Sequence, residues 1–415
     1  MKRLVLLATG LLSVHLSAAE VLIDNVMIYD GQKDPYQADM LLRDGVIAEI
    51  GQNLTTTGSI IDGRGKTLSA GIFNGNTHLG VVEVGAIKDT VDYRSDNIDY
   101  TASLSVAEAI NPYSVLIPYN RSLGLTRALV VPENDNHIFA GSAALIQLRD
   151  DQMILNPSVG MVVNLGQHGK DVAGGSRATG LAMLRTALDE AKEFAAYKSQ
   201  IMKGEYRDLS LSYHDLAALQ PVLSGDLPLI VKVDRAADIL RVVELAQQYK
   251  LSLVLMSARE AWRVASELAN AKVAVIMDPI NNLPMGYDSL GARLDAAAIL
   301  NQAGVELVFT GMGDDASHNA ALVRQSAANA VAHGLPVTAA IKAITSTPAR
   351  LFNAEKFGGI QIGQPADLVI WDGHPLEAMS IPEHVYVAGK AMSLVSRASR
   401  LADRYLQRIR AFQGN

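Results

Sequence analysis

The stretch LSAGIFNGNTHLGVVEVG, residues 68–85, decides how the fold of this chain is interpreted. Its first half is an apolar run that predicts a buried strand, and the strand ends at two polar side chains, Asn76 and His78. Alternate residues of a strand point to the same side, so these two are expected on one face. If residue 76 were histidine, the strand would end in a His-x-His pair, a pattern that binds a metal ion at the mouth of a barrel. The stretch therefore predicts a barrel strand that ends in a site.

Apolar strands alternate with amphipathic helices along the middle of the chain. Further strands are expected over residues 126–132, 160–166, 227–234, 251–257, 273–279 and 306–312, with an eighth over 137–148. Continuous Val, Ile and Leu strands between helices favour a parallel sheet covered on both sides. The length of 70–351 is typical of a (β/α)8 TIM barrel. A doubly wound open sheet is the alternative, but no Gly-x-Gly-x-x-Gly follows an early strand.

Short strands with turn signals flank this middle part. They precede it at residues 21–31, 38–51 and 59–68 and follow it at 366–373 and 384–395. The turns are typical of hairpins in an antiparallel sheet. We therefore expect a small composite β-sandwich domain formed by both termini. The expected division is 20–66 and 363–397 for this domain, 67–362 for the barrel, and 398–415 for a helix that docks or forms an oligomer contact.

The segment MKRLVLLATGLLSVHLSAAE at the N-terminus has the pattern of a secretory signal peptide. Lys2 and Arg3 precede a short apolar run that ends in small residues, so cleavage is expected after Ala19. A membrane anchor is the alternative, but the run is short for a span and contains His15. We expect a periplasmic protein, with residues 1–19 removed and no membrane span in the mature chain.

The composition excludes several classes of function. Of the 415 residues, 49% are hydrophobic and 19% are charged, as in a globular protein. A formal net charge of −7 gives no basic footprint for nucleic acid. The chain contains no cysteine, which excludes disulfides, thiolate metal ligands and a cysteine nucleophile.

Polar side chains stand at the expected C-terminal ends of several strands, where the chemistry of a TIM barrel lies. Lys232 and Asp234 share one face of their strand, and a lysine within a Val/Ile run is costly unless it is paired. We expect Lys232 to meet Asp234 or Asp314. The glycine-rich segment 166–180 lacks the Walker phosphate-binding pattern and is expected to be a loop over the mouth.

At this point the chain resembles the amidohydrolase superfamily, specifically its imidazolonepropionase-like branch. The resemblance is strongest in KTLSAGIFNGNTHLG, residues 66–80, and in residues 338–377. The second segment contains an Ala-x-Thr-x-x-Pro-Ala step, a Gly-x-Ile-x-x-Gly-x-x-Ala-Asp-Leu run and an Asp-x-x-Pro-Leu turn. The resemblance covers nearly all of the mature chain. It implies a composite β domain joined to a metal-bearing (β/α)8 barrel.

The resemblance also implies a set of metal ligands. In this family a divalent cation polarises the scissile carbonyl and activates a water molecule. Its ligands are a His-x-His on the first strand, a lysine or glutamate on the fourth, a histidine on each of the fifth and sixth, and an aspartate on the eighth that is also the general base. The first strand here has Asn76 and His78, and the fourth has no lysine or acidic ligand, although His168 and Lys170 follow it closely. The matching residues on the later strands are Lys232 with Asp234 on the fifth, Ser257 on the sixth and Asp314 on the eighth. Only His78 and Asp314 keep the family's residue type, whereas catalytic zinc normally needs three protein ligands, so the metal site is degenerate.

Two functions are consistent with this pattern. The first is hydrolysis of a non-peptide C–N bond in a small amide or cyclic amide, with Asp314 as base, His78 polarising the carbonyl or binding metal, and Lys232 in the electrophilic role. The expected substrate-binding residues are Asn76, His168, Asp234 and His318. The second is a catalytically inactive relative that binds a small molecule or partners an intact amidohydrolase.

Several of these assignments keep an alternative. His78 is either a ligand or a histidine that forms hydrogen bonds without metal, and Asp314 is either the base or the N-cap of the following helix. The expected cofactor is one divalent metal, zinc or manganese, or none. A homo-oligomer or a complex with a paralogous amidohydrolase is the expected assembly.

Overall fold

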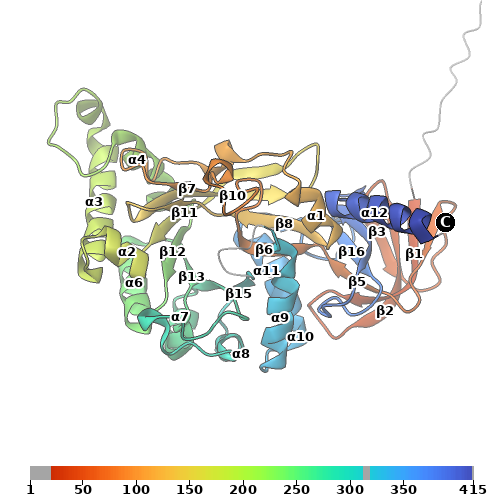
Figure 1. Cartoon of the computed structure of the whole chain (residues 1–415). Helices are drawn as coiled ribbons and strands as arrows, with labels where there is room; N and C mark the ends of the chain where they lie inside the picture. The colour runs from red at the N-terminus through yellow and green to blue at the C-terminus, as the bar shows by residue number, and fades with distance from the viewer. Residues whose placement is uncertain (1–19, 312–317, 414–415) are drawn as a thin grey trace, which may run out of the picture.

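The computed structural model describes residues 20–311 and 318–413. Figure 1 shows two sheets side by side, one surrounded by helices and one formed by the two ends of the described chain. The predicted signal peptide and Asp314 both lie outside the described residues. No helix in the described ranges is long and apolar enough to span a membrane.

Eight strands form the barrel sheet, as the sequence predicted. In spatial order they are β6 (Ile72–Thr77), β8 (Leu125–Val130), β10 (Phe139–Gln147), β11 (Ile154–Asn164), β12 (Leu229–Val233), β13 (Leu253–Ser257), β14 (Ala274–Met277) and β15 (Leu307–Phe309). The barrel is nearly closed: Thr310, just after β15, donates a hydrogen bond from Oγ1 to the backbone oxygen of Asn76 at 2.9 Å. A Cβ atom on Gly75 would lie 2.5 Å from Val308 Cγ1, so β6 packs tightly against β15.

Strand β10 runs antiparallel to both of its neighbours, β8 and β11, which differs from the expected all-parallel barrel. The connections before and after β10 span residues 131–138 and 148–153. These are too short for the helical crossover that a parallel strand requires. Because Phe139 pairs with Val163 near the end of β11, the start of β10 lies at the mouth of the barrel.

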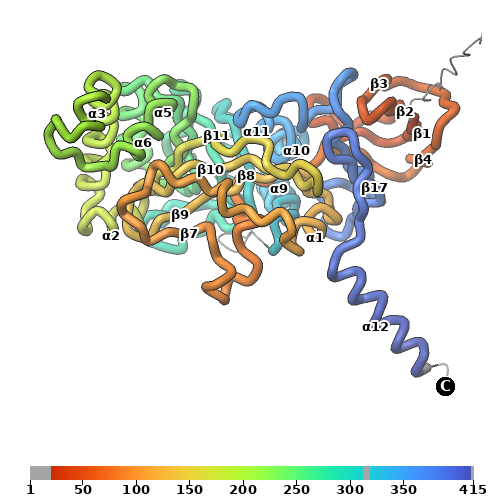
Figure 2. Tube along the Cα trace, turned by 90° about the horizontal axis from the view of Figure 1, so that it is seen from above, coloured from red at the N-terminus to blue at the C-terminus, as the bar shows by residue number. Residues whose placement is uncertain are grey.

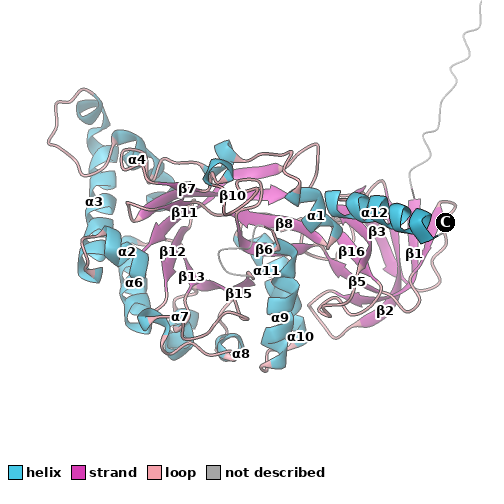
Figure 3. Ribbon diagram, in the orientation of Figure 1, coloured by secondary structure: helices cyan, strands magenta, loops and turns pink. Residues whose placement is uncertain are grey.

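Helices cover the outside of the barrel, as Figure 3 shows for α3, α6 and α7. Their bounds are α1 (Leu116–Ser122), α2 (Gln167–Val172), α3 (Arg177–Met202), α4 (Tyr213–Ala218), α5 (Gln220–Ser224), α6 (Ala236–Tyr249), α7 (Ala265–Asn270), α8 (Ala296–Gln302), α9 (Val323–Ala332), α10 (Val337–Ala343), α11 (Ser346–Leu351) and α12 (Arg397–Gln413). Short 3₁₀ turns are η1 (Lys88–Thr90), η2 (Val106–Ala109), η3 (Ala261–Val264), η4 (Tyr287–Ser289) and η6 (Ala320–Leu322). The prediction of a loop over residues 166–180 was wrong: the segment forms α2 and the start of α3, and its two consecutive glycines only separate the two helices.

The second sheet contains strands from both ends of the chain, as expected. Its path is β18 (Lys390–Ala391), β17 (Pro382–Val387), β16 (Leu368–Trp371), β5 (Thr67–Ala70), β1 (Glu20–Tyr29), β2 (Tyr36–Arg43) and β3 (Val46–Gly51), with β4 (Ser59–Asp62) paired to β1. It is mixed and not purely antiparallel, since β1 is parallel to both β4 and β5. Strand β5 extends this sheet past residue 66, where the barrel was expected to begin. A short parallel pair, β7 (Arg94–Ser95) and β9 (Glu133–Asn134), stands apart from both sheets.

The barrel interior is filled by apolar side chains. Phe73, Ile230, Val254, Ile276 and Val308 belong to one buried cluster inside the barrel. On β12 the residue two positions beyond Ile230 is Lys232, which therefore lies on the same face, one layer nearer the mouth. The packed interior thus forms a floor beneath the polar residues at the strand ends.

Candidate functional site

A cavity of about 130 Å³ lies at the C-terminal ends of the barrel strands. Its lining comes from the ends of β6, β12 and β13 and from the segments that follow β13, β14 and β15: Asn76, Lys232, Met256, Ser257, Arg259, Asp278, Asn281, Asn282 and Thr310. Of the residues singled out in the sequence, Asn76 and Lys232 are brought together here. Most of the lining is polar, and two of its residues are cationic.

Lys232 forms an ion pair with Glu133 on β9, whose Oε1 lies 3.0 Å from the ammonium nitrogen. The other carboxylate oxygen of Glu133 accepts a hydrogen bond from Arg94 on β7 at 2.9 Å. Of the two expected partners of Lys232, Asp234 forms no ion pair with it, and Asp314 lies outside the described residues. Strand β9 instead brings Glu133, 99 positions away along the chain, to the mouth. Glu133 is therefore a site residue that the sequence analysis missed.

Glu133 is held in its ionised form. Burial raises the pKa of this carboxyl, but the charges of Lys232 and His78 and the hydrogen bonds from Lys232 and Arg94 together outweigh burial and lower the pKa to about 2. The lysine and the glutamate thus form a fixed charge pair beside the cavity.

His78 is buried, with 4% of its surface exposed, and stacks on Tyr93 with ring centroids 3.6 Å apart. It lies near enough to Glu133 for its charge to lower the pKa of that carboxyl. The pairing of β6 with β8 is irregular between Asn74 and Thr77. Asn74 donates a hydrogen bond to the backbone oxygen of Ala320 at 2.8 Å.

Arg259 enters the cavity because of an unusual backbone turn. Ser257 and Ala258 both adopt left-handed conformations, with φ of +70° and +49°, at the end of β13. The Oδ1 atom of Asp234 accepts the backbone N–H of Arg259 at 3.2 Å, which supports this turn. The guanidinium of Arg259 has no ion pair in the described part of the chain. The acid that follows it, Glu260, instead lies near Arg263, with Oε2 at 4.0 Å from Arg263 Nε. Arg259 follows Ser257 by two residues in MSARE, and no glycine or asparagine there indicates the turn.

The other predicted binding residues support the rim and do not line the cavity. His168 Nε2 lies 2.7 Å from the backbone oxygen of Asn134, next to Glu133. His318 Nε2 lies 2.8 Å from the backbone oxygen of Glu83. Asp234 supports the turn described above. Each of these three side chains thus contacts a backbone atom in the structure, and the predicted contacts with a substrate stay a prediction.

The comparisons with known proteins agree with this architecture. A family model described as "Amidohydrolase family" matches residues 207–394. The solved structure of an amidohydrolase from Thermotoga maritima MSB8 superposes with a TM-score of 0.80 at 23% sequence identity and covers 90% of this chain and 99% of that one. Over residues 207–394 the chain is similar to the amidohydrolase family.

Other amidohydrolase relatives are more distant or longer. The amidohydrolase tasK of Hapsidospora irregularis is 22% identical over 430 residues, which cover 89% of this chain. This chain spans only 43% of the length of that relative. The ochratoxinase of A. niger has a TM-score of 0.51 at 14% identity and covers 90% of this chain and 96% of its own. At these identities the solved structures establish the fold alone.

A metal of the kind that the amidohydrolase resemblance implies does not fit the described donors. No group of three or more His, Cys, Asp or Glu side chains within residues 20–311 and 318–413 could hold a metal ion. Where the family has a fifth-strand histidine, the Lys232 ammonium carries a positive charge of its own, and like charges repel. Within the described residues, the mouth of the barrel contains an internal ion pair between Lys232 and Glu133.

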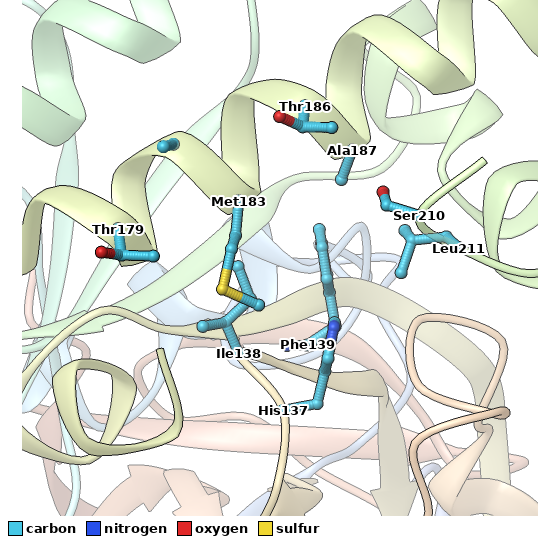
Figure 4. Close-up of a pocket in the computed structure, with 10 residues that line it drawn as sticks. His137, Ile138, Phe139, Thr179, Met183, Thr186, Ala187, Ser210 and Leu211 are labelled. Carbon is cyan, nitrogen blue, oxygen red and sulfur yellow. Dashed lines mark hydrogen bonds between the residues drawn. The ribbon is translucent and has the colours of Figure 1, made fainter. Parts of the chain in front are cut away.

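A second, mostly apolar cavity of about 240 Å³ lies between the start of β10 and helix α3 of the barrel. In Figure 4, Met183 from α3 and Phe139 from β10 point into it, with Ser210 and Leu211 at one side. Burial lowers the pKa of His137 in its wall and thereby favours the neutral imidazole. The cavity contains no charged side chain among its described lining residues, so it offers shape and apolar surface without an evident reactive group.

Proposed function

We propose that this chain binds a small amide or cyclic amide at the barrel mouth and hydrolyses its non-peptide C–N bond. The observation that carries the proposal is the position of Lys232, which lines the cavity at the strand ends. Its Nζ atom lies 3.0 Å from Glu133 Oε1, and this ion pair holds the ammonium in place. This is the position at which TIM barrels place their chemistry. Similarity to the amidohydrolase family over residues 207–394 supports the same reaction class.

The cavity offers complementary partners for both polar ends of an amide. An ammonium has three donors, and with one of them given to Glu133 Lys232 can direct another at a carbonyl oxygen. Its charge would stabilise the negative charge that develops on that oxygen during attack. Asn76 Oδ1 is buried and accepts no hydrogen bond from the described part of the chain, so it can receive the N–H of the amide.

Arg259 indicates that the proposed substrate carries a negative charge. A guanidinium without an ion pair that faces a cavity is suited to a carboxylate, which it can bind through two parallel hydrogen bonds. Among the described residues, the acidic side chains at or near the mouth already have partners: Glu133 pairs with Lys232 and Arg94, and Asp278 accepts hydrogen bonds from Ser326 and Asn281. The proposed substrate is therefore an amide that carries a carboxylate.

The remaining roles in the proposal come from the resemblance. Asp314 is the proposed general base, and it lies outside the described residues. His78 is proposed to polarise the carbonyl. Export to the periplasm and assembly with a second copy or with a paralogous amidohydrolase are proposed on the sequence pattern alone.

A second candidate function is binding of the same class of molecule without hydrolysis. The observation that favours it is the lack of a ligand cluster within the described ranges, together with Ser257 at the position of the family's sixth-strand histidine. In that case Lys232, Asn76 and Arg259 would recognise the ligand, which would dissociate unchanged.

The experiment uses the chain from Glu20 onward with N-acyl amino acids and cyclic amides, each as a carboxylate and as the matched carboxamide. Calorimetry measures binding and mass spectrometry measures hydrolysis. We expect Arg259→Gln to weaken binding of the carboxylates roughly tenfold or more, because it removes a charge-assisted pair, and to leave the carboxamides unchanged. Arg241→Gln, an exposed arginine on α6 paired with Glu244, is the matched control and is expected to change neither.

Hydrolysis by the unmodified chain distinguishes the two candidate functions, and Lys232→Met tests the role of the ammonium. If Lys232 stabilises the developing oxyanion, its loss lowers the hydrolysis rate on the order of 100-fold. Binding without any hydrolysis in the unmodified chain would favour the second candidate. No binding to any of these amides would contradict both.

Metal analysis tests the expected cofactor separately. The protein is produced in medium supplemented with zinc and manganese, and its metal content is measured by plasma mass spectrometry. About one metal per chain, lost on His78→Ala, would mean an altered but functional metal site. Metal-free protein that still hydrolyses an amide would assign the electrophilic role to Lys232.

A further inference from the structure

Helix α12, residues Arg397–Gln413, leaves the body of the molecule and points away from it, as Figure 2 shows. Almost every residue along it whose burial is described is exposed; only Ser399 and Leu401 are partly covered. The helix thus gains little from packing within this chain. An isolated helix of this length is marginal in water, so a surface that covers one side of it would stabilise it.

One side of α12 is apolar. Leu401, Tyr405, Ile409 and Phe412 recur at intervals of three and four residues and therefore share a face. Tyr405, Ile409 and Phe412 are 55%, 51% and 84% exposed. Large apolar side chains gathered on one exposed face mark a contact surface, whereas scattered ones do not.

The rest of the helix is strongly basic. It carries five arginines, Arg397, Arg400, Arg404, Arg408 and Arg410, and a single acidic residue, Asp403. The whole chain has a net charge of −7, so the positive charge of this helix is a local concentration of the opposite sign. Most of the arginines stand beside the apolar face, where their long stems can lie on an apolar surface while the charged ends reach outward.

We propose that α12 binds the surface of an anionic lipid bilayer, with its apolar face in the interfacial layer and its arginines on the phosphates. An amphipathic helix with arginine on one side and aromatic and aliphatic residues on the other has the composition of an interfacial helix. Its arginines forbid a spanning arrangement, and its projection from the body lets it lie on a plane.

A second copy of this chain is the less suitable occupant. Two α12 helices paired through their apolar faces would bring two rows of arginines together, with one aspartate in each helix to offset them. Like charges at such spacing destabilise a helix pair. An anionic lipid surface instead supplies the opposite charge along the full length of the helix.

The test is co-sedimentation of the chain from Glu20 onward with vesicles of phosphatidylcholine, with and without phosphatidylglycerol. This chain keeps every described residue and omits the apolar leader, which could itself bind lipid. We expect binding to the anionic vesicles, weakened by salt, and little binding to phosphatidylcholine alone. Arg404→Gln with Arg408→Gln is expected to weaken it roughly 30-fold, from about 1 kcal/mol for each arginine.

Ile409→Ser with Phe412→Ser is expected to weaken binding roughly tenfold or more, because two partly inserted side chains are lost. Gln407→Ala, on the opposite side of the helix, is the matched control and is expected to bind as the unmodified chain does. All of these positions are exposed, so folding is checked simply by circular dichroism.

Three outcomes would overturn the proposal: no binding to anionic vesicles, binding that none of the variants weakens, or a lipid-free dimer in sedimentation velocity that Phe412→Ser dissociates. The last outcome would assign the apolar face to a second copy of the chain.

Discussion

At the scale of single residues, the mouth of the barrel is organised around an internal cation. Lys232 lies one layer above the apolar floor, and the Glu133 carboxylate keeps its charge in place at 3.0 Å. Arg94 shares the same carboxylate from the outer side at 2.9 Å. Lys232 and Glu133 are both partly buried, with 19% and 21% of their side chains exposed, so each charge stabilises the other, whereas Arg94 is 44% exposed and adds less.

The low pKa of Glu133 predicts a specific dependence of stability on pH. Its pKa in the folded state is about 2, below its ordinary value of 4.5, so the pair stabilises the fold above about pH 4.5 and is lost as the pH falls through 2. The loss amounts to about 3 kcal/mol of unfolding free energy over that window. Urea unfolding at a series of pH values measures it.

The same measurement on Lys232→Met isolates the contribution of the pair. The variant is expected to be less stable at neutral pH, and its difference from the unmodified chain should shrink as the pH falls from 4.5 toward 2. Lys198→Met, at an exposed position on α3, should keep the full pH dependence. An acid loss in Lys232→Met equal to that of the unmodified chain would contradict this account.

The site residues show where sequence reasoning ends. Asn76 and Lys232 were predictable because each is a polar residue near the end of an apolar strand, where the alternation of side chains indicates the face on which it lies. Glu133 was not, since its contact with Lys232 depends on a short strand, β9, that has no apolar run of its own. Arg259 depends on two left-handed residues, Ser257 and Ala258, neither of which is a glycine or asparagine that would have indicated the turn.

At the scale of elements, the barrel strands were predictable and the direction of one was not. Strand β10 is buried along its whole length, so its apolar run gives no alternation and no orientation. Only the shortness of its two connections requires the antiparallel arrangement. The consequence for the site is direct: the connection from β8 to β10 crosses the mouth and carries Glu133 and Asn134.

Closure of the barrel predicts a cost for a side chain at Gly75 on β6. A Cβ there would lie 2.5 Å from Val308 Cγ1 and 3.1 Å from Ile276 Cγ2. We expect Gly75→Ala to lower the unfolding free energy by about 1–3 kcal/mol, the usual cost of overpacking a core. The midpoint of urea unfolding followed by circular dichroism measures this.

Gly85→Ala is the matched control, because a Cβ at Gly85 meets no atom within 4 Å and its φ is not positive. It should leave the midpoint unchanged or raise it slightly, since alanine restricts the unfolded chain. Equal midpoints for the two variants would mean that β6 and β15 are not in close contact.

At the scale of the whole molecule, one buried ion pair joins the barrel to the terminal sheet. Arg127 on β8 pairs with Asp367, which precedes β16, and both side chains are almost fully buried. The carboxylate also accepts a hydrogen bond from Thr126 Oγ1 at 3.0 Å and one from the backbone N–H of Ala388 at 3.1 Å. The Ala-Asp-Leu motif near the C-terminus thus serves to dock the sheet on the barrel.

This arrangement predicts that Asp367→Ala destabilises the molecule strongly. It leaves the Arg127 guanidinium buried without its carboxylate, which typically costs about 3–5 kcal/mol. Removing only the hydroxyl, in Thr126→Val, should cost about 1 kcal/mol, because the ion pair survives. Urea unfolding measures both, with the emission of Trp371 as a probe, since its indole is buried beside the junction and donates a hydrogen bond to Ser69 Oγ at 2.9 Å.

A double variant shows whether the cost comes from the unpaired charge. Arg127→Met with Asp367→Leu replaces the pair by apolar side chains of similar size, and such replacements are often neutral or stabilising. We therefore expect the double variant to be more stable than Asp367→Ala alone, although it loses two charged groups instead of one. If the double variant is instead the less stable of the two, the pair contributes net attraction across the junction, and the barrel and the terminal sheet are held together by that ion pair and not by the apolar packing around it.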